Sequence, residues 1–212
     1  SLKSGIATQP WGQVYPGDLR YKDLSGPNGV PDGKIDEHDQ TVIRFSNWAP
    51  EIIFGLAPTV QWKNFDLNAL IQGATRTSIS LGETLVMPFF DSGSATKLQF
   101  KDHWTPDNTD AKYPRLRSSG TINGNNNYTQ SDFWLINGAY LRLKTLNVGY
   151  DFKHKLLKKT PWITKCTLAL SGYNLFTISP ATKYGMDPEI GNTNFYDYPT
   201  TRTYAVSLNI GF

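Results

Sequence analysis

Apolar and polar residues alternate along five segments of the chain. Alternation predicts β-strands, because successive side chains of a strand point to opposite faces of the sheet. The clearest case is residues 202–212, where the odd positions are small or polar. The even positions are aromatic or aliphatic: Tyr204, Val206, Leu208, Ile210 and Phe212. At roughly 10 residues, this segment has the length of a tilted membrane-spanning strand.

The same reading predicts four earlier strands, at residues 51–62, 65–77, 139–152 and 163–179. Lys63 and Asn64 separate the first two strands, which predicts a tight hairpin turn. In the third strand the apolar positions change parity between Leu143 and Leu146. An extra residue in one strand produces such a change, so we predict a β-bulge near Lys144 and Thr145.

The connections between these strands fall into two length classes. Residues 62–65 and 153–162 form short turns, whereas residues 1–50, 78–138 and 178–201 form long segments rich in Gly, Pro, Asn and Asp. If the strands run up and down, every short turn lies at one end and every long loop at the other. Outer-membrane barrels show this asymmetry of short periplasmic turns and long extracellular loops. The pattern thus favours an all-β, antiparallel transmembrane β-barrel with long extracellular loops.

Alternation by itself fits a second architecture equally well. In a soluble β-sandwich the apolar face of each strand is turned inward to a core. Five strands cannot close a membrane barrel, since bacterial barrels begin at about 8 strands. The barrel interpretation therefore predicts that the chain, which begins at Ser1, is part of a longer or processed protein. Phe212 ends the apolar face of the last predicted strand, where the even positions of residues 204–212 resemble a barrel-assembly signal.

Composition argues against several classes of protein for this chain. No window contains the ~20 consecutive apolar residues of a membrane helix, although alternating barrel strands would not show one. The net charge is only +3, and no basic run is interleaved with aromatic residues, which argues against nucleic-acid binding. The single cysteine, Cys166, excludes an internal disulfide framework and a cysteine-rich zinc site.

Four stretches resemble the SusC/RagA family of TonB-dependent outer-membrane transporters, in the order in which that family carries them. Residues 16–23 (PGDLRYKD) precede an acidic loop and residues 40–43 (QTVI). The second stretch is WTP at 104–106 with AKYPRL at 111–116, and the third is NGAYLRLKTL at 137–146, continuing to Gly149 and Tyr150. The fourth is SGYNLFT at 171–177, followed by GMDPE at 185–189 and YP at 198–199.

The resemblance implies that the chain is the C-terminal portion of a barrel of about 22 strands. It further implies a bacterial outer membrane location, contact with membrane lipid and energy from a TonB complex through parts outside this chain. A SusD-like surface lipoprotein would act as a lid, and the cargo would be oligosaccharides or peptides. A soluble, calcium-stabilised β-sandwich that binds glycans is the alternative from a different class.

The acidic loop at residues 23–39 gathers five of the chain's 18 acidic residues. Its second half, DGKIDEHD at 32–39, resembles an EF-hand loop, in which oxygen ligands alternate around a glycine turn. Asp23 and Ser25 would supply the opening ligands if residues 26–31 loop out. The predicted structural Ca²⁺ ligands are Asp23, Ser25, Asp32, Lys34, Asp36 and Asp39. Lys34 would contribute its backbone carbonyl oxygen, as the residue after the glycine does in an EF-hand loop. A solvated acidic turn closed by Asx-type hydrogen bonds is the alternative.

Two further groups of residues concern binding and catalysis. Aromatic residues in the long loops could stack on cargo or pack against a lid, or simply pack within the loops: Trp104, Tyr113, Tyr128, Phe195, Tyr196 and Tyr198. Asp107 and Asp110 could form a carboxylate pair of a glycoside hydrolase, but exposed loops commonly carry acids that do no chemistry. The three histidines are scattered and lack metal-ligand spacing, and no Gly-rich phosphate loop follows a predicted strand, so we expect no enzyme.

Overall fold

The computed structural model describes residues 5–43, 45–46, 49–118, 125–153, 157–190, 198 and 200–212. These residues belong to two compact units. Unit 1 comprises residues 1–44 and 80–135, and unit 2 comprises residues 45–79 and 136–212. Among the described residues, no helix is both long enough and apolar enough to cross a membrane.

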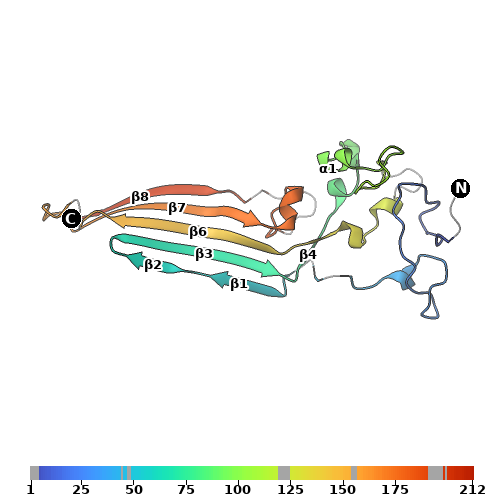
Figure 1. Ribbon diagram of the computed structural model, residues 1–212, viewed down its shortest axis with the longest axis horizontal. Coiled ribbons are helices and arrows are strands. Elements are labelled where there is room, and N and C mark those ends of the chain that lie inside the picture. The colour runs from blue at the N-terminus through green and yellow to red at the C-terminus, as the bar shows by residue number, and fades with distance from the viewer. Residues whose placement is uncertain are drawn as a thin grey trace. The chain divides into compact units, whose positions relative to one another are not determined.

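Unit 2 is built on a single antiparallel sheet. Its strands are β1 (Ile52–Leu56), β2 (Thr59–Trp62), β3 (Phe65–Thr75), β6 (Tyr140–Asp151), β7 (Lys165–Ile178) and β8 (Thr203–Gly211). They are ordered β1-β3-β6-β7-β8, and β2 also pairs with β3. Figure 1 shows the strands running side by side as one long ribbon, with the β2–β3 turn at the end opposite η6 (Pro180–Tyr184).

The register of this sheet places most large apolar side chains on one face, because directly paired residues of an antiparallel sheet point to the same side. Ile53, Leu70 and Tyr173 are exceptions on the other face. The apolar face crosses every strand: Ile52, Phe54, Leu56, Val60, Trp62, Phe65, Leu67, Ile71, Leu141, Leu143, Leu146, Val148, Tyr150, Leu168, Leu170, Phe176, Ile178, Tyr204, Val206, Leu208 and Ile210. The polar face opposes it: Thr59, Gln61, Asp66, Asn68, Gln72, Arg142, Thr145, Asn147, Thr167, Ser171, Thr177, Ser207 and Asn209.

Local irregularities keep the two faces separate. Lys63, at φ 55°, forms the tight turn predicted between β2 and β3. Pro58 divides the first predicted strand into β1 and β2, because proline has no N–H for the ladder, although its carbonyl accepts from Ala69 N–H at 3.0 Å. The predicted β-bulge is confirmed: pairing with β3 skips Lys144, so that Leu143 and Leu146 share the apolar face.

The apolar face has no covering layer in the described part of unit 2. Val206 is 72% exposed and Leu208 is 60% exposed, and no second sheet packs against them. A water-soluble sandwich would bury such a face against its partner sheet, since burial of apolar area drives folding in water. The exposed apolar face thus supports a barrel wall whose outer solvent is lipid rather than a sandwich half.

The remaining chain contains only short elements in its described residues. Strands β4 (Ser78–Ser80) and β5 (Leu135–Asn137) form a two-stranded sheet. The helical turns are η1 (Glu37–Asp39), η2 (Glu83–Leu85), η3 (Phe90–Ser92), η4 (Asn125–Tyr128), η5 (Asp132–Trp134) and the α-helix α1 (Lys97–Lys101). With the exception of these elements, unit 1 consists of loops and turns in its described residues.

The core of unit 1 contains buried amide side chains as well as apolar ones. Its fully buried large side chains are Trp134, Gln99, Asn126 and Asn127. The Gln99 amide donates to the carbonyl oxygens of Leu85 and Val86 at 3.1 and 3.2 Å, while its oxygen completes the capping box of α1. Buried amides are tolerated only when they are bonded in this way, so each holds a loop segment in place.

An ion pair between Arg115 and Asp18 lies in the same unit. The Asp18 carboxylate, whose side chain is 0% exposed, accepts from Arg115 Nε and Nη2 at 2.6 and 2.7 Å. The same carboxylate accepts from Asn127 Nδ2 at 3.0 Å and from the Tyr15 N–H at 2.9 Å. A bidentate guanidinium pair fixes orientation as well as distance, so Asp18 ties together three loop segments of unit 1.

Candidate functional site

A charged site of unit 2 centres on Arg142, near the start of β6. Strand alternation places Arg142 on the polar face, opposite Gln72 of β3 and Thr177 of β7. The residue is only 2% exposed, although its guanidinium carries a full charge. A buried cation must be paired and hydrogen-bonded to be tolerated.

Three different groups satisfy the Arg142 guanidinium. Nε donates to Thr177 Oγ1 at 2.8 Å, Nη1 to Glu189 Oε2 at 2.6 Å and Nη2 to Asp187 Oδ1 at 2.5 Å. Lys144, the bulged residue, lies 3.0 Å from Glu189 Oε1. Two cations of β6 therefore meet two carboxylates of the loop that follows η6, and the four formal charges cancel. We call these four residues the ion cluster.

Capping and turn residues around η6 determine the course of the loop that carries Asp187 and Glu189. Ser179 caps η6 and accepts from the Ala181 N–H at 3.2 Å, and Pro180 occupies the first turn. Gly185 ends η6 at φ 73°, a left-handed conformation that glycine adopts without strain. Ala181 and Met186 are buried. These contacts return the chain toward β6, so that Asp187 and Glu189 reach Arg142.

The environment of Asp187 favours its ionised form. Burial raises the pKa of Asp187, but hydrogen bonds from Thr200, from the Glu189 N–H and from Arg142 outweigh burial and leave the pKa below its usual range. The carboxylate is therefore ionised at neutral pH, which keeps the ion cluster electrically balanced.

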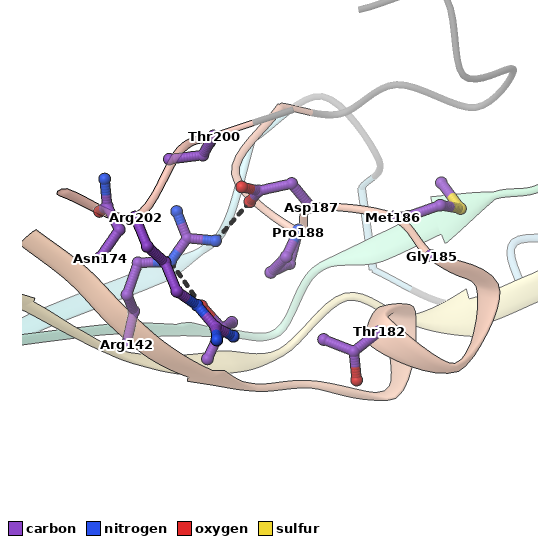
Figure 2. A pocket seen from close by; sticks show the side chains of 10 residues that line it. Arg142, Asn174, Thr182, Gly185, Met186, Asp187, Pro188, Thr200 and Arg202 are labelled. Atoms are coloured by element: carbon purple, nitrogen blue, oxygen red, sulfur yellow. Dashed lines mark hydrogen bonds and ion pairs between the residues drawn. The ribbon is translucent and has the colours of Figure 1, made fainter. Parts of the chain in front are cut away.

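Beside the ion cluster lies a cavity of about 300 Å³, which we call the outer polar cavity. Figure 2 shows Arg142 and Asp187 joined across it, with Asn174, Thr182, Thr200 and Arg202 around its rim. No aromatic residue is among its lining residues in the described part of the chain. A cavity of this size is at the lower end of those that bind small molecules. The arrangement offers charge and hydrogen bonds but no nucleophile paired with a base.

The predicted calcium ligands lie in a loop that is organised by its own backbone. Asp39 accepts from the N–H groups of Leu24, Ser25 and Asp36, and Asp23 accepts from the Gly33 N–H at 2.7 Å. Gly33, at φ 84°, makes the sharp turn that an EF-hand loop requires. Asp32 accepts from the Lys34 N–H, and Asp36 accepts from the His38 N–H.

The hydrogen bonds to Asp36 and Asp39 favour the ionised forms of these two carboxylates. Backbone hydrogen bonds are the main reason that the pKa of Asp36 and the pKa of Asp39 are lowered. One oxygen of Asp23, Oδ1, is buried and has no hydrogen-bond partner among the described residues, which would suit a cation ligand. However, within the described ranges no three His, Cys, Asp or Glu side chains are grouped to hold a metal. The geometry resembles the Asx-bonded turn of the alternative interpretation, and Ca²⁺ binding stays a prediction.

The predicted aromatic binding residues do not form one site. Tyr113 and Tyr128 are buried within unit 1, and burial raises the pKa of Tyr128 to about 12 while its hydroxyl donates to the Arg117 carbonyl. Both rings therefore pack within the loops, as the second interpretation expects, because they complete the core of the loop unit. Trp104 packs over Gly17, where a Cβ would approach its ring to 2.5 Å. Tyr198 is 82% exposed, and Phe195 and Tyr196 lie outside the described residues.

The last strand places its predicted assembly-signal residues together. Tyr204, Val206, Leu208 and Ile210 lie on the apolar face of β8, and Phe212 follows them. The Phe212 ring stacks on Trp162 with ring centroids 5.9 Å apart and an interplanar angle of 2°. Their role in assembly stays a prediction.

Sequence reasoning did not assign the ion cluster to a site. Arg142 and Lys144 lie in one of the quoted stretches, and Asp187 and Glu189 lie in another. A usable signal was present: two cations two residues apart on the polar side of a predicted strand are costly without partners. The acids of residues 185–189 were candidates for those partners.

The fold and the two-faced sheet define a segment of an outer-membrane β-barrel wall. Comparisons with known proteins agree with this class. No family model matches the chain. The TonB-dependent receptor P3 of Formosa agariphila is 29% identical over 100% of this chain, and SusC of Bacteroides thetaiotaomicron is 25% identical over 91%. A solved RagAB peptide transporter structure aligns with a TM-score of 0.67 and 23% identity over 90% of the chain.

These similarities confirm the relationship to SusC/RagA-type TonB-dependent transporters that the sequence motifs predict. The chain spans about a fifth of the length of its relatives: 20% of the Formosa receptor, 19% of SusC and 20% of the RagAB chain. The relationship places the chain in the bacterial outer membrane. Its relatives are receptors and transporters rather than enzymes, in agreement with the lack of a catalytic motif in the sequence.

Proposed function

We propose that this chain forms part of the wall of an outer-membrane TonB-dependent active transporter. The observation that supports the proposal most directly is the two-faced sheet of unit 2. Its continuous apolar face suits contact with lipid hydrocarbon, and its opposite face is polar, as the lumen of a transport barrel is. The strands need no catalytic residue for this role, because they separate lipid from the cargo path and carry the loops.

The cargo in this proposal is an oligosaccharide or a peptide, captured under a SusD-like surface lipoprotein. Two of the similar solved structures are described as a peptide importer and a peptide transporter, which supports the peptide alternative. The similarity to SusC supports a transporter of the same architecture without naming the cargo. The partners would contact loops and domains of the complete transporter, and TonB would act through parts outside this chain.

Uptake by the complete transporter tests the proposal. We expect deletion of its gene to abolish import of at least one labelled peptide or oligosaccharide pool, and deletion of TonB to have the same effect. Re-expression of the complete transporter should restore import. Uptake that is unaffected by either deletion, or recovery of the full-length protein in the soluble fraction, would contradict the proposal.

The lid partner has its own test. Purification of the complete transporter from outer membranes in mild detergent should yield one surface lipoprotein in stoichiometric amount. A transporter that purifies alone and still imports cargo at the normal rate would remove the lipoprotein from the proposal while leaving the transport function intact.

A further inference from the structure

Among its described lining residues, the outer polar cavity contains one cation, Arg202, that does not belong to the ion cluster. All three nitrogen atoms of the Arg142 guanidinium already donate, to Thr177, Asp187 and Glu189. Lys144 is paired with Glu189 as well. The charges of Arg142 and Lys144 therefore balance those of Asp187 and Glu189, and this part of the wall is electrically neutral.

Arg202 adds a positive charge to the same cavity. It lines the cavity immediately before β8 and is exposed, and Figure 2 shows it beside Asn174 and Thr200. Within the described ranges, no acidic side chain lies within ion-pair distance of Arg202. A guanidinium carries a permanent charge and presents a planar fork of donors that matches a carboxylate.

The other polar groups around Arg202 are largely occupied. The Asn174 amide donates to the Thr201 carbonyl at 3.2 Å, and the Thr182 hydroxyl donates to the Ser179 carbonyl at 2.6 Å. The Thr200 side chain bonds to Asp187. These bonds hold the rim in place, so among the described lining residues Arg202 is the charged group that remains to receive a ligand.

The lining also indicates which kind of cargo fits. Sugars are commonly held against aromatic rings, and no aromatic side chain lines this cavity among the described residues. Its lining instead combines Arg202 with the apolar side chains of Met186 and Pro188. Such a mixture suits a short peptide segment that presents one acidic group and some apolar surface.

We propose that the outer polar cavity is a subsite for acidic peptides, in which Arg202 binds a carboxylate of the cargo. The ion cluster holds the floor of the cavity rigid and neutral, so the charge of Arg202 is not cancelled by Asp187 or Glu189. This inference rests on the proposed transport function and specifies its cargo.

Binding of two matched peptides to the complete, purified transporter tests the subsite. The probes are a C-terminally amidated hexapeptide with two glutamates and its twin with glutamines, measured by calorimetry at low and high salt. We expect the glutamate peptide to bind more tightly, and its advantage to shrink as salt rises, because the attraction is screened. Arg202→Gln should weaken its binding about 5- to 10-fold, in the range of a partly exposed charged hydrogen bond.

Matched variants separate charge from structure. Lys183→Gln removes an exposed cation of η6 that does not line the cavity, and it should leave binding unchanged. Arg202→Lys should retain part of the preference, because it keeps the charge but loses the planar fork. Heat-modifiable migration of each variant on gels reports whether the barrel is intact.

Equal binding of the two peptides by the wild-type transporter, no binding of either, or unchanged binding by Arg202→Gln would overturn the subsite. Stronger competition by an oligogalacturonate than by the glutamate peptide would also overturn it, in favour of acidic sugars. Those results would leave TonB-dependent uptake intact, whereas failure of the transport proposal would abolish uptake of every cargo.

Discussion

The two units of the chain differ in which side chains they bury and which they expose. Unit 2 turns its large apolar side chains outward, with Val206 and Leu208 more than half exposed, and keeps charges such as Arg142 on the opposite face. Unit 1 buries Trp134 together with the amides of Gln99, Asn126 and Asn127. In lipid, strands are held by their ladders and their apolar surface, whereas loops in water are held by bonded polar side chains.

The largest expected effect concerns the ion pair of unit 1. Asp18→Ala leaves Arg115 without its carboxylate and removes an acceptor from Asn127, which should destabilise unit 1 by about 3 to 5 kcal/mol. Hydrogen exchange of the complete transporter should show loss of protection throughout unit 1 with the sheet unaffected. Asp107→Ala, at an exposed acid of the same unit, is the control and should change nothing. Equal loss of protection in the strands would show that the units do not unfold separately.

The next effect distinguishes the two faces of one strand. Leu208→Arg places a charge on the apolar face near the middle of β8 and should destabilise the barrel by about 2 to 3 kcal/mol in lipid. Ser207→Arg places the same charge one residue away on the polar face and should cost much less. Urea unfolding of the complete transporter in vesicles measures both. Similar losses for both variants would argue against a lipid-facing apolar surface.

A smaller effect concerns the pH range of the ion cluster. Because the pKa of Asp187 is lowered in the folded state, its contribution is fully present above about pH 4 and is lost as pH falls through the folded pKa. Protease protection of the loop after η6 should therefore persist from neutral pH to about pH 4 and weaken below it. Asp187→Asn should weaken protection at neutral pH and flatten its acid dependence. Loss of protection already near pH 6 would assign the dependence to another group.

The smallest effect concerns the acidic loop. If residues 23–39 bind Ca²⁺, millimolar calcium should slow proteolysis within this loop, and Asp32→Asn should remove the response. Asp107→Asn provides a control for removal of an acid elsewhere in unit 1. A response that is the same with Mg²⁺ would indicate general screening of clustered acids rather than a calcium site.

Much of the sheet could be predicted because its determinants are local. The alternation of residues 204–210, the Lys63 turn and the parity change around Lys144 each specify backbone geometry within a few residues. The ion cluster could not be predicted in the same way. It joins Arg142 to Asp187 and Glu189, and their contact depends on the fold of η6 and the Gly185 turn between them.

The aromatic residues of the loops show the same distinction. Tyr113, Tyr128 and Tyr198 all lie in polar, turn-rich segments. Local composition therefore does not distinguish which of the three rings is exposed and able to bind a ligand. Two of them are buried and the third is 82% exposed. Their environments differ because Tyr113 and Tyr128 pack around a small cavity that they share with Val86 and Trp134, which come from separate segments of the chain.

The sequence alone therefore determined the strands and the bulge, because strand geometry repeats every two residues, and its four motif stretches indicated the family resemblance and with it a barrel rather than a sandwich. Only the tertiary structure decided which charges pair, which rings are buried and where Arg202 lies. Those outcomes depend on contacts between distant segments, and no local period encodes them.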